Sequence, residues 1–376
     1  MVFYCLITAL TIALSYGIVN RPALKLHHTT RQQAFNYVCL AGIFLVLAGV
    51  AALRIEVGND YGKYVDTFHE IYAGTDAAYV VTETGFNFVV KAVYTLSGFE
   101  NYLLVFALFG AATAFLFLKA LYDESVHFGA SFAMFMLLGL YFRTFTTVRY
   151  YFALALALYS LQFVRKKEYG KFVLLIVFGA LFHKSVLVVI PMYLLAQIRW
   201  RKWMFAVLAF FSAAVFLFQQ PLLNLALEWY PTYRNTVYLS QGTGLLANAS
   251  GILRCLCVFA LAAFCYEDSV KDSADNRFYL KLNLFGFLLY TCGSFLPLVS
   301  RIAYYAVTPQ ILLVPGLIAG IRDPKKKRIA AAAAVLFCLG YFAYFLMTAS
   351  GGGIRVLPYK TWIFTEKEWI NGSDFF

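Results

Sequence analysis

A histidine and a lysine interrupt one of the long apolar stretches of this sequence. His183 and Lys184 lie in GALFHKSVLVVIP, residues 179–191. Charged or titrating side chains are costly inside a membrane, by about 2.5–3.5 kcal/mol for Arg, Lys or Asp on insertion scales, and they usually mark a site. Histidine accepts protons near neutral pH, so His183 is a candidate general base. The alternatives are a packing role for His183 and an interfacial anchor for Lys184.

Three arginines and two acids also occupy unusual positions. Arg149 opens the apolar run VRYYFALALALYSL, whereas Arg54 and Arg301 stand at the edges of other apolar runs. Asp60 and Glu83 lie in short polar segments between such runs. Arginine binds phosphate through paired hydrogen bonds and stays charged, although at a helix end it can simply reach the lipid headgroups. If the arginines, the acids and His183 share one face, they predict an anionic substrate handled there.

The elements that must position these residues are membrane-spanning helices. Of the 376 residues, 62% are hydrophobic and 19% aromatic, and apolar runs recur along the whole chain. Runs of about 20 residues cross the roughly 30 Å of hydrocarbon as helix. We therefore predict an all-α, polytopic integral membrane protein with about 11–12 crossings in one embedded domain, residues 1–376. The expected spans are 2–19, 36–53, 101–121, 129–143, 146–164, 203–219, 250–266, 278–297, 302–320 and 329–349, with a further element around His183.

Five basic clusters set the expected orientation, at residues 20–31, 165–171, 199–202, 271–277 and 322–328. Clusters of this kind favour the cytoplasmic side. For residues 165–171 and 199–202 to share a side, the chain between them must form a hairpin with His183 and Lys184 at its outer tip. The segment 84–97 is short and contains Lys91, so we expect an amphipathic or re-entrant helix on the outer face. Outer segments 54–100 and 220–249 and the tail 350–376 are expected to cover the site.

Several classes of function are disfavoured. The net charge of +12 is spread over short clusters and forms no basic domain for nucleic acid. The seven cysteines have no metal-ligand or disulfide spacing, and no Asp-x-Asp pair seats a divalent ion, so we expect neither metal nor cofactor.

The order and spacing of four segments resemble the EpsG family of bacterial polysaccharide polymerases. They are LRIEVGNDYGKYVDTF, TETGFNFVVKAVYTLSGFENYLLVFALFGAATAFLFLKAL, TVRYYFALALALYSLQFVRKKEYGKFVLLIVFGALFHKSVLVVIPMYLL and LVSRIAYYAV. The family's Phe-His-x-Ser element is intact around His183, and its Arg…Gly-x-Asp element is present from Arg54 to Asp60. Thr84 replaces the proline that usually follows Glu83, and Tyr150 replaces the glutamine that usually follows Arg149.

The resemblance implies a Wzy-like polymerase, similar to O-antigen polymerases and ligases of the glycosyltransferase C class. Such a protein joins undecaprenyl-pyrophosphate-linked oligosaccharide repeat units of O-antigen, capsule or exopolysaccharide at the outer face of the bacterial cytoplasmic membrane. The lipid-linked oligosaccharide is donor and acceptor, membrane lipid surrounds the chain, and a chain-length regulator is an expected partner.

The implied reaction is an inverting, metal-independent glycosyl transfer. In it, His183 acts as base, with Asp60 or Glu83 orienting or replacing it. Arg149, Arg301 and Arg54 hold the pyrophosphate. Lys184, Tyr304 and Tyr305 are weaker candidates for substrate binding. The alternatives are a membrane O-acyltransferase, which would need a thioester donor, and a lipid-linked oligosaccharide flippase, which would show duplicated helices.

Overall fold

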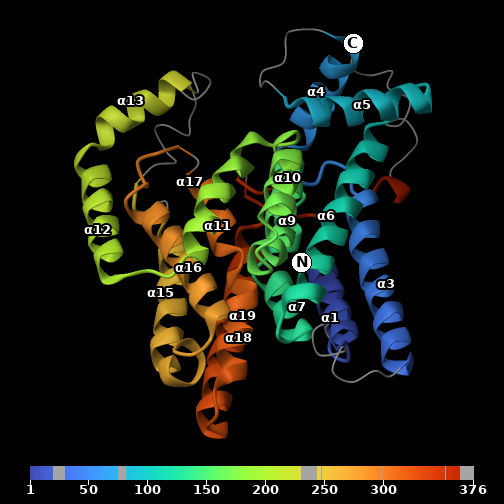
Figure 1. Ribbon diagram of the computed structural model, residues 1–376. Coiled ribbons are helices and arrows are strands. Elements are labelled where there is room, and N and C mark those ends of the chain that lie inside the picture. The colour runs from blue at the N-terminus through green and yellow to red at the C-terminus, as the bar shows by residue number, and fades with distance from the viewer. Residues whose placement is uncertain are drawn as a thin grey trace.

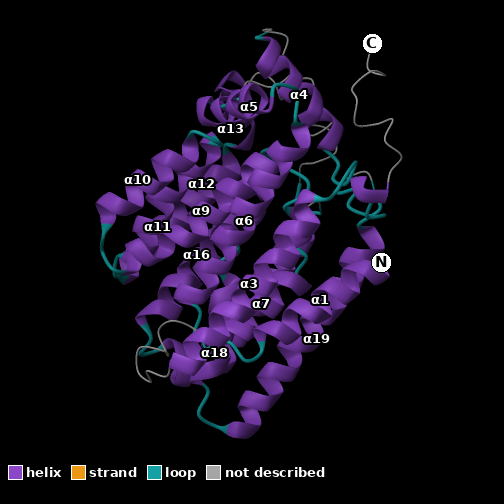
Figure 2. Cartoon of the chain, turned by 90° about the vertical axis from the view of Figure 1, so that its right-hand side faces the viewer, coloured by secondary structure: helices purple, strands orange, loops and turns teal. Residues whose placement is uncertain are grey.

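The computed structural model describes residues 1–19, 30–74, 82–229, 244–246, 248–297, 299–351 and 353–364. The predicted all-α class is confirmed, because the described chain consists of helices and connecting loops, with a single isolated β-bridge between Arg54 and Thr361 (Figures 1 and 2). The α-helices are α1 (Val2–Ser15), α3 (Thr30–Ala52), α4 (Tyr61–Ala73), α5 (Thr84–Ser97), α6 (Tyr102–Glu124), α7 (Phe128–Leu137), α8 (Leu140–Arg143), α9 (Val148–Arg165), α10 (Tyr169–Ala180), α11 (Val189–Gln197), α12 (Lys202–Leu217), α13 (Gln219–Trp229), α15 (Ala249–Phe264), α16 (Ala274–Thr291), α17 (Val299–Val307), α18 (Gln310–Gly320) and α19 (Pro324–Thr348). Short helices of other types are η1 (Lys184–Val188), η3 (Tyr266–Val270) and η4 (Trp362–Phe364).

The chain is a multi-pass membrane protein by the length and apolar character of its helices. Four segments are long and apolar enough to cross a membrane singly, at residues 31–52, 102–124, 299–320 and 324–348. The pair α12 and α13, bent by 79°, makes a fifth when counted as one span. Five shorter apolar segments, of 10–17 residues, accompany them. The total of 11–12 crossings stays a prediction.

Helix α9 forms the centre of the bundle. Its sequence is apolar on every side apart from its two ends, and nearly all of its side chains are buried. A helix that is apolar all round lies either in lipid or in a protein core, and the buried side chains of α9 place it in the core. Helices α6, α10, α11 and α17 all contact α9. Arg149, the second residue of α9, is therefore held at the centre of one end of the bundle.

The expected hairpin around His183 is confirmed. Helix α10 ends at Ala180, and the chain returns through η1 and α11. The rings of Phe172 and Tyr193 stack with centroids 6.1 Å apart, and Gly179 faces Val186, as expected for two antiparallel arms. His183 thus lies at the tip, outside both arms.

The two ends of the bundle carry different residues. At one end, Arg165 forms ion pairs with Glu124 and Asp275, which brings the basic clusters 165–171 and 271–277 together. We call this the basic end. The opposite end, which we call the site end, contains the hairpin tip and residues 54–60. Residues 354–360 bond to the backbone of residues 55–59 there, and the Tyr4 hydroxyl donates to the Val356 carbonyl, so the described parts of both termini lie at the site end.

Helices α4 and α5 lie across the site end (Figure 1). Segment 84–97 is the helix α5 with the expected bounds. Its buried residues, Phe86, Val90, Val93 and Tyr94, follow the spacing of one helix face, whereas Phe88 on another face is exposed. The amphipathic prediction is therefore confirmed.

Some predicted spans are wrong in their limits. The predicted span 129–143 is divided into α7 and α8 at Leu138 and Gly139, where Gly139 adopts a positive φ. The predicted span 302–320 begins earlier, at Val299, and breaks before Gln310, because Pro309 has no N–H to continue the helix. Within the predicted outer segments, residues 75–81, 230–243, 247, 352 and 365–376 lie outside the described part of the chain.

The turn before Asp60 requires glycine. Gly58 has φ +109°, and a Cβ atom there would lie 2.2 Å from the Phe145 carbonyl oxygen. We expect Gly58→Ala to destabilise the protein by roughly 2–4 kcal/mol, because the strained φ and the backbone clash act together. The measurement is the thermal unfolding midpoint in detergent. Gly62→Ala is the control, since nothing lies within 4 Å of that Cβ; equal midpoints for the two variants would contradict the prediction.

Candidate functional site

Glu83 joins α5 to α9 and to the hairpin tip. One carboxylate oxygen accepts a hydrogen bond from Arg149 Nη1 at 2.6 Å, and the other accepts one from the Lys184 backbone N–H at 3.1 Å. The side chains of Arg149 and Glu83 are 11% and 10% exposed. Gly85 makes this approach possible, because a Cβ atom there would lie 2.8 Å from the Leu181 Cβ. The structure thus brings two predicted site residues, far apart in sequence, into a buried ion pair.

The His183 side chain lies beside the same Glu83 carboxylate. Its Nδ1 is 3.7 Å from Glu83 Oε1, longer than a hydrogen bond, and Nδ1 has no other partner within the described chain. The imidazole ring stands edge-on to Tyr150, with centroids 5.6 Å apart. Burial, followed by the positive charges of Arg149 and Arg301, lowers the pKa of His183 from 6.5 to about 3. The imidazole is therefore neutral at pH 7 and has a proton-accepting nitrogen.

Arg301 brings a second cation toward His183 from α17. Its backbone carbonyl accepts a hydrogen bond from the Tyr150 hydroxyl at 2.7 Å, which fixes the start of α17 against α9. Its guanidinium is half-buried and forms no ion pair within the residues that the structure describes. The charges of Arg149 and Arg301 thus both act on one histidine, and of the two only Arg149 has a carboxylate partner among the described residues.

Asp60 contacts the start of α9 at a different point. The Thr147 hydroxyl donates to Asp60 Oδ2 at 3.2 Å, and Lys63 Nζ is 4.0 Å from Oδ1. Glu83, and not Asp60, is the acid that lies beside His183.

Arg54 is placed differently from the other two arginines. It is 2% exposed, and its Nη1 donates to the carbonyls of Val57 and Phe145. Its guanidinium carbon also lies 4.9–6.0 Å from the ring centroids of Phe145, Phe106 and Tyr61. The donors of Arg54 thus hold the 54–60 turn against residues 143–147, which suits a positioning residue better than direct contact with pyrophosphate.

The other three candidates, Lys184, Tyr304 and Tyr305, lie in different surroundings. The Lys184 side chain is exposed beside the tip, where it can reach a ligand. Tyr305 is fully buried, with its hydroxyl 3.0 Å from the Ser185 hydroxyl, and so supports the hairpin tip from below. Tyr304 faces away from the tip toward Arg254, whose guanidinium carbon is 5.4 Å from its ring centroid.

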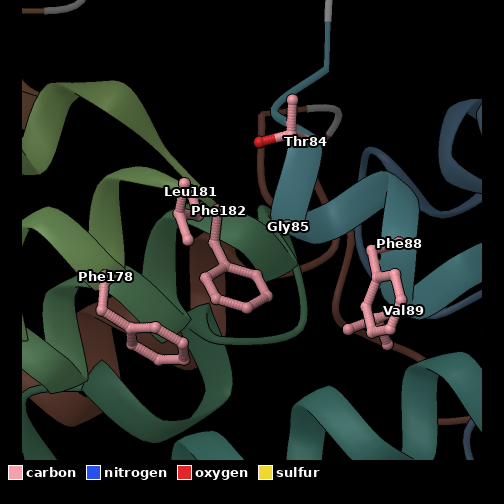
Figure 3. Close-up of a pocket in the computed structure, with 7 residues that line it drawn as sticks. All are labelled: Thr84, Gly85, Phe88, Val89, Phe178, Leu181 and Phe182. Carbon is pink, nitrogen blue, oxygen red and sulfur yellow. The ribbon is translucent and has the colours of Figure 1, made fainter.

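A cavity of about 440 Å³ adjoins the cluster between α5 and the hairpin tip. Figure 3 shows Phe178, Leu181 and Phe182 on the hairpin side and the start of α5 on the other. Its lining residues, Thr84, Gly85, Phe88, Val89, Phe178, Leu181 and Phe182, directly follow Glu83 or precede His183 in sequence. An apolar chamber thus opens beside the charged groups.

Within the described chain no three His, Cys, Asp or Glu side chains come close enough to hold a metal ion. Sequence reasoning missed two other cations, Arg143 at the end of α8 and Arg254 in α15. The signal was available for Arg254, because it is a charged residue inside the predicted span 250–266.

The family comparison covers the whole of this cluster. The EpsG family profile matches residues 37–361, which include Arg54, Glu83, Arg149, His183 and Arg301. Comparison with curated proteins and with solved structures gives no match. The chain therefore belongs to the EpsG family, and membership implies a role in polysaccharide synthesis for this multi-pass membrane protein.

Proposed function

We propose that the protein is a Wzy-like polymerase that joins polyprenyl-pyrophosphate-linked oligosaccharide repeat units at the outer face of the cytoplasmic membrane. The proposal rests on one observation. His183 lies near Glu83, Arg149 and Arg301 at the site end of the bundle, opposite the basic end. A neutral histidine between two arginines suits a reaction in which an anionic group leaves as a hydroxyl loses its proton.

The two arginines are the proposed pyrophosphate ligands. Arg149 donates Nη1 to Glu83 and also hydrogen-bonds to Tyr64, and its buried Nε, which has no partner among the described residues, is left for a ligand. Arg301 contributes its entire guanidinium. Donors fixed in place stabilise the negative charge that grows on a leaving group, in many enzymes by more than any other single effect. Here that charge would grow on the pyrophosphate as the glycosidic bond breaks.

The proposed step is a single displacement. The acceptor hydroxyl oxygen bonds to the anomeric carbon of the donor sugar, and the bond from that carbon to the pyrophosphate oxygen breaks. The bonding electrons leave with the lipid pyrophosphate, the hydroxyl proton passes to His183, and the anomeric configuration inverts.

Donor binding would itself activate His183. Burial, followed by the positive charges of Arg149 and Arg301, lowers its pKa in the free protein. A pyrophosphate held by both arginines opposes those charges, so the pKa of His183 rises toward its ordinary range and the imidazole becomes a better base. Glu83, 3.7 Å from Nδ1, is placed to stabilise the imidazolium that forms.

The cavity between α5 and the hairpin tip supports a lipid-linked donor. Its apolar wall lies directly beside the charged cluster, and an amphiphile with an anionic head needs both surfaces. We assign this cavity to the first units of the donor's polyprenyl chain.

The test is the size profile of the cell's polysaccharide in a strain that lacks this protein, complemented with wild type, Arg301→Gln or Arg328→Gln. We expect the deletion and Arg301→Gln to lose long chains and accumulate single lipid-linked repeats. Arg328→Gln, which changes an exposed arginine at the start of α19, should restore wild-type chains. Unchanged chain length with loss of acyl groups from the polymer would favour an O-acyltransferase instead.

A further inference from the structure

Among the described residues, the buried Arg254 and the half-buried Arg143 have no acidic partner. Arg254 is 6% exposed, and Arg143 has a buried Nε with no hydrogen-bond partner. In the described chain no Asp or Glu pairs with either one, and their ionisable neighbours are Tyr151, Tyr290, Tyr304, Tyr341 and Cys255. The charges of both arginines act on Tyr304, and the Arg254 guanidinium carbon is 5.4 Å from the centroid of its ring.

Other partly or fully buried arginines of the bundle have a carboxylate or carbonyl acceptor. Arg149 pairs with Glu83, Arg165 pairs with Glu124 and Asp275, and Arg54 donates to two carbonyl groups. A buried charge is costly unless it is paired and hydrogen-bonded. Arg254 hydrogen-bonds to Tyr304 and Arg143 to Tyr341, but in the described chain the buried Nε of each arginine has no partner, so both guanidinium groups keep a donor for an anion.

Arg254 also lines a second cavity, of about 420 Å³. The groove runs along one face of α15 from Arg254 to Phe264, about 15 Å at the helical rise of 1.5 Å per residue. Helices α7, α18 and α19 complete the walls, and the lining is apolar beyond Arg254 and Gln310. The groove therefore has one cationic end, toward the site end of the bundle, and an apolar remainder that extends toward the basic end.

We propose that Arg143 and Arg254 bind the phosphate of a second polyprenyl-linked molecule, whose chain lies in the groove between α15 and α19. Charge complementarity fixes the polarity of this ligand, because the cationic end takes the phosphate and the apolar walls take the chain. The choice of a single-chain polyprenyl lipid over a diacyl phospholipid rests on the proposed function.

This second site lies next to the first. Tyr304 follows Arg301 by three residues in α17, and Tyr151 interacts with both Arg143 and Arg301. Joining two lipid-linked repeat units requires a donor and an acceptor to be bound at once. The Arg143–Arg254 site would hold the acceptor lipid while the donor occupies Arg149 and Arg301.

The experiment counts bound lipids by native mass spectrometry on full-length protein with undecaprenyl phosphate as the probe. Four chains are compared: wild type, Arg254→Gln, Ala333→Phe and Ala332→Phe. Ala333 lines the groove, whereas the neighbouring Ala332 is exposed outside it and provides the matched control. Dissociation constants are measured on the same samples, with phosphatidylglycerol as competitor.

We expect two molecules bound at saturation to wild type and to Ala332→Phe, and one to Arg254→Gln and to Ala333→Phe. Loss of the charged contact should weaken the second site by about ten- to a hundredfold. If wild type binds one molecule and the two groove variants bind none, the result supports the second site and contradicts lipid binding at the Arg149–Arg301 donor site. If both groove variants bind as many as wild type, or if phosphatidylglycerol displaces the probe at equal concentration, the proposal is overturned.

Discussion

Replacing His183 by alanine is expected to slow chain elongation by about 10²–10⁴-fold, the usual contribution of a general base. The protein should still fold, because His183 lies at the tip of the hairpin and not within its arms. The readout is the initial rate of elongation with purified protein and a lipid-linked repeat. His69→Ala is the control, since His69 is exposed and paired with Glu100 away from the cluster. A His183→Ala protein that elongates at the wild-type rate would exclude His183 as the base.

The same hypothesis predicts the direction in which the pH dependence of elongation should shift. In the free protein burial, followed by the charges of Arg149 and Arg301, lowers the pKa of His183 to about 3, so the acid limb of kcat/KM should lie well below pH 6.5. With donor bound, the pyrophosphate opposes those charges, so the acid limb of kcat should lie at higher pH than that of kcat/KM. In Arg301→Gln, which removes one positive neighbour, the kcat/KM limb should move to higher pH. A shift in the opposite direction would show that another group is titrating.

Replacing Arg149 by alanine is expected to reduce elongation by about 10²–10³-fold, the usual effect of losing one fixed donor to a developing negative charge. It should also destabilise the protein, because Glu83 would remain buried without its partner, at a cost of about 3–5 kcal/mol for a broken buried pair. Elongation rate and unfolding midpoint are measured together.

The double variant Arg149→Met with Glu83→Gln separates the two effects. It removes both charges, so stability should return toward that of wild type while elongation stays low. Arg149→Lys keeps the charge, but one ammonium group cannot serve Glu83 and a phosphate in the forked geometry of a guanidinium, so its rate should also fall. Recovery of elongation in the double variant would mean that Arg149 is needed for folding only.

Much of the fold could be predicted from the sequence because apolar run length and charge parity are global constraints. The parity of the basic clusters predicted the hairpin, and the Phe172–Tyr193 stack bears it out. The short length of 84–97 and its Lys91 likewise predicted a helix that does not cross. The helix break before Gln310 was missed, because run length alone does not weigh what Pro309 removes.

The candidate site was less predictable, because its charges meet through contacts between distant segments. Sequence alone left Asp60 and Glu83 as equal partners for His183, and only the packing of Gly85 on Leu181 brings Glu83 to the tip. Position at the edge of an apolar run made Arg54 and Arg301 look alike, yet Arg54 is bound by carbonyl groups and Arg301 has no acid partner within the described ranges. Arg254 was overlooked although its place within a span was visible.

The central claim is polymerisation, and its most direct measurement uses purified protein in lipid nanodiscs with a single undecaprenyl-pyrophosphate-linked repeat unit and a chelator of divalent ions. We expect a ladder of lipid-linked oligomers and the release of one undecaprenyl pyrophosphate with each addition. Both should be lost in His183→Ala. A repeat unit that stays single while wild-type protein moves it across a membrane or acylates it would contradict polymerisation.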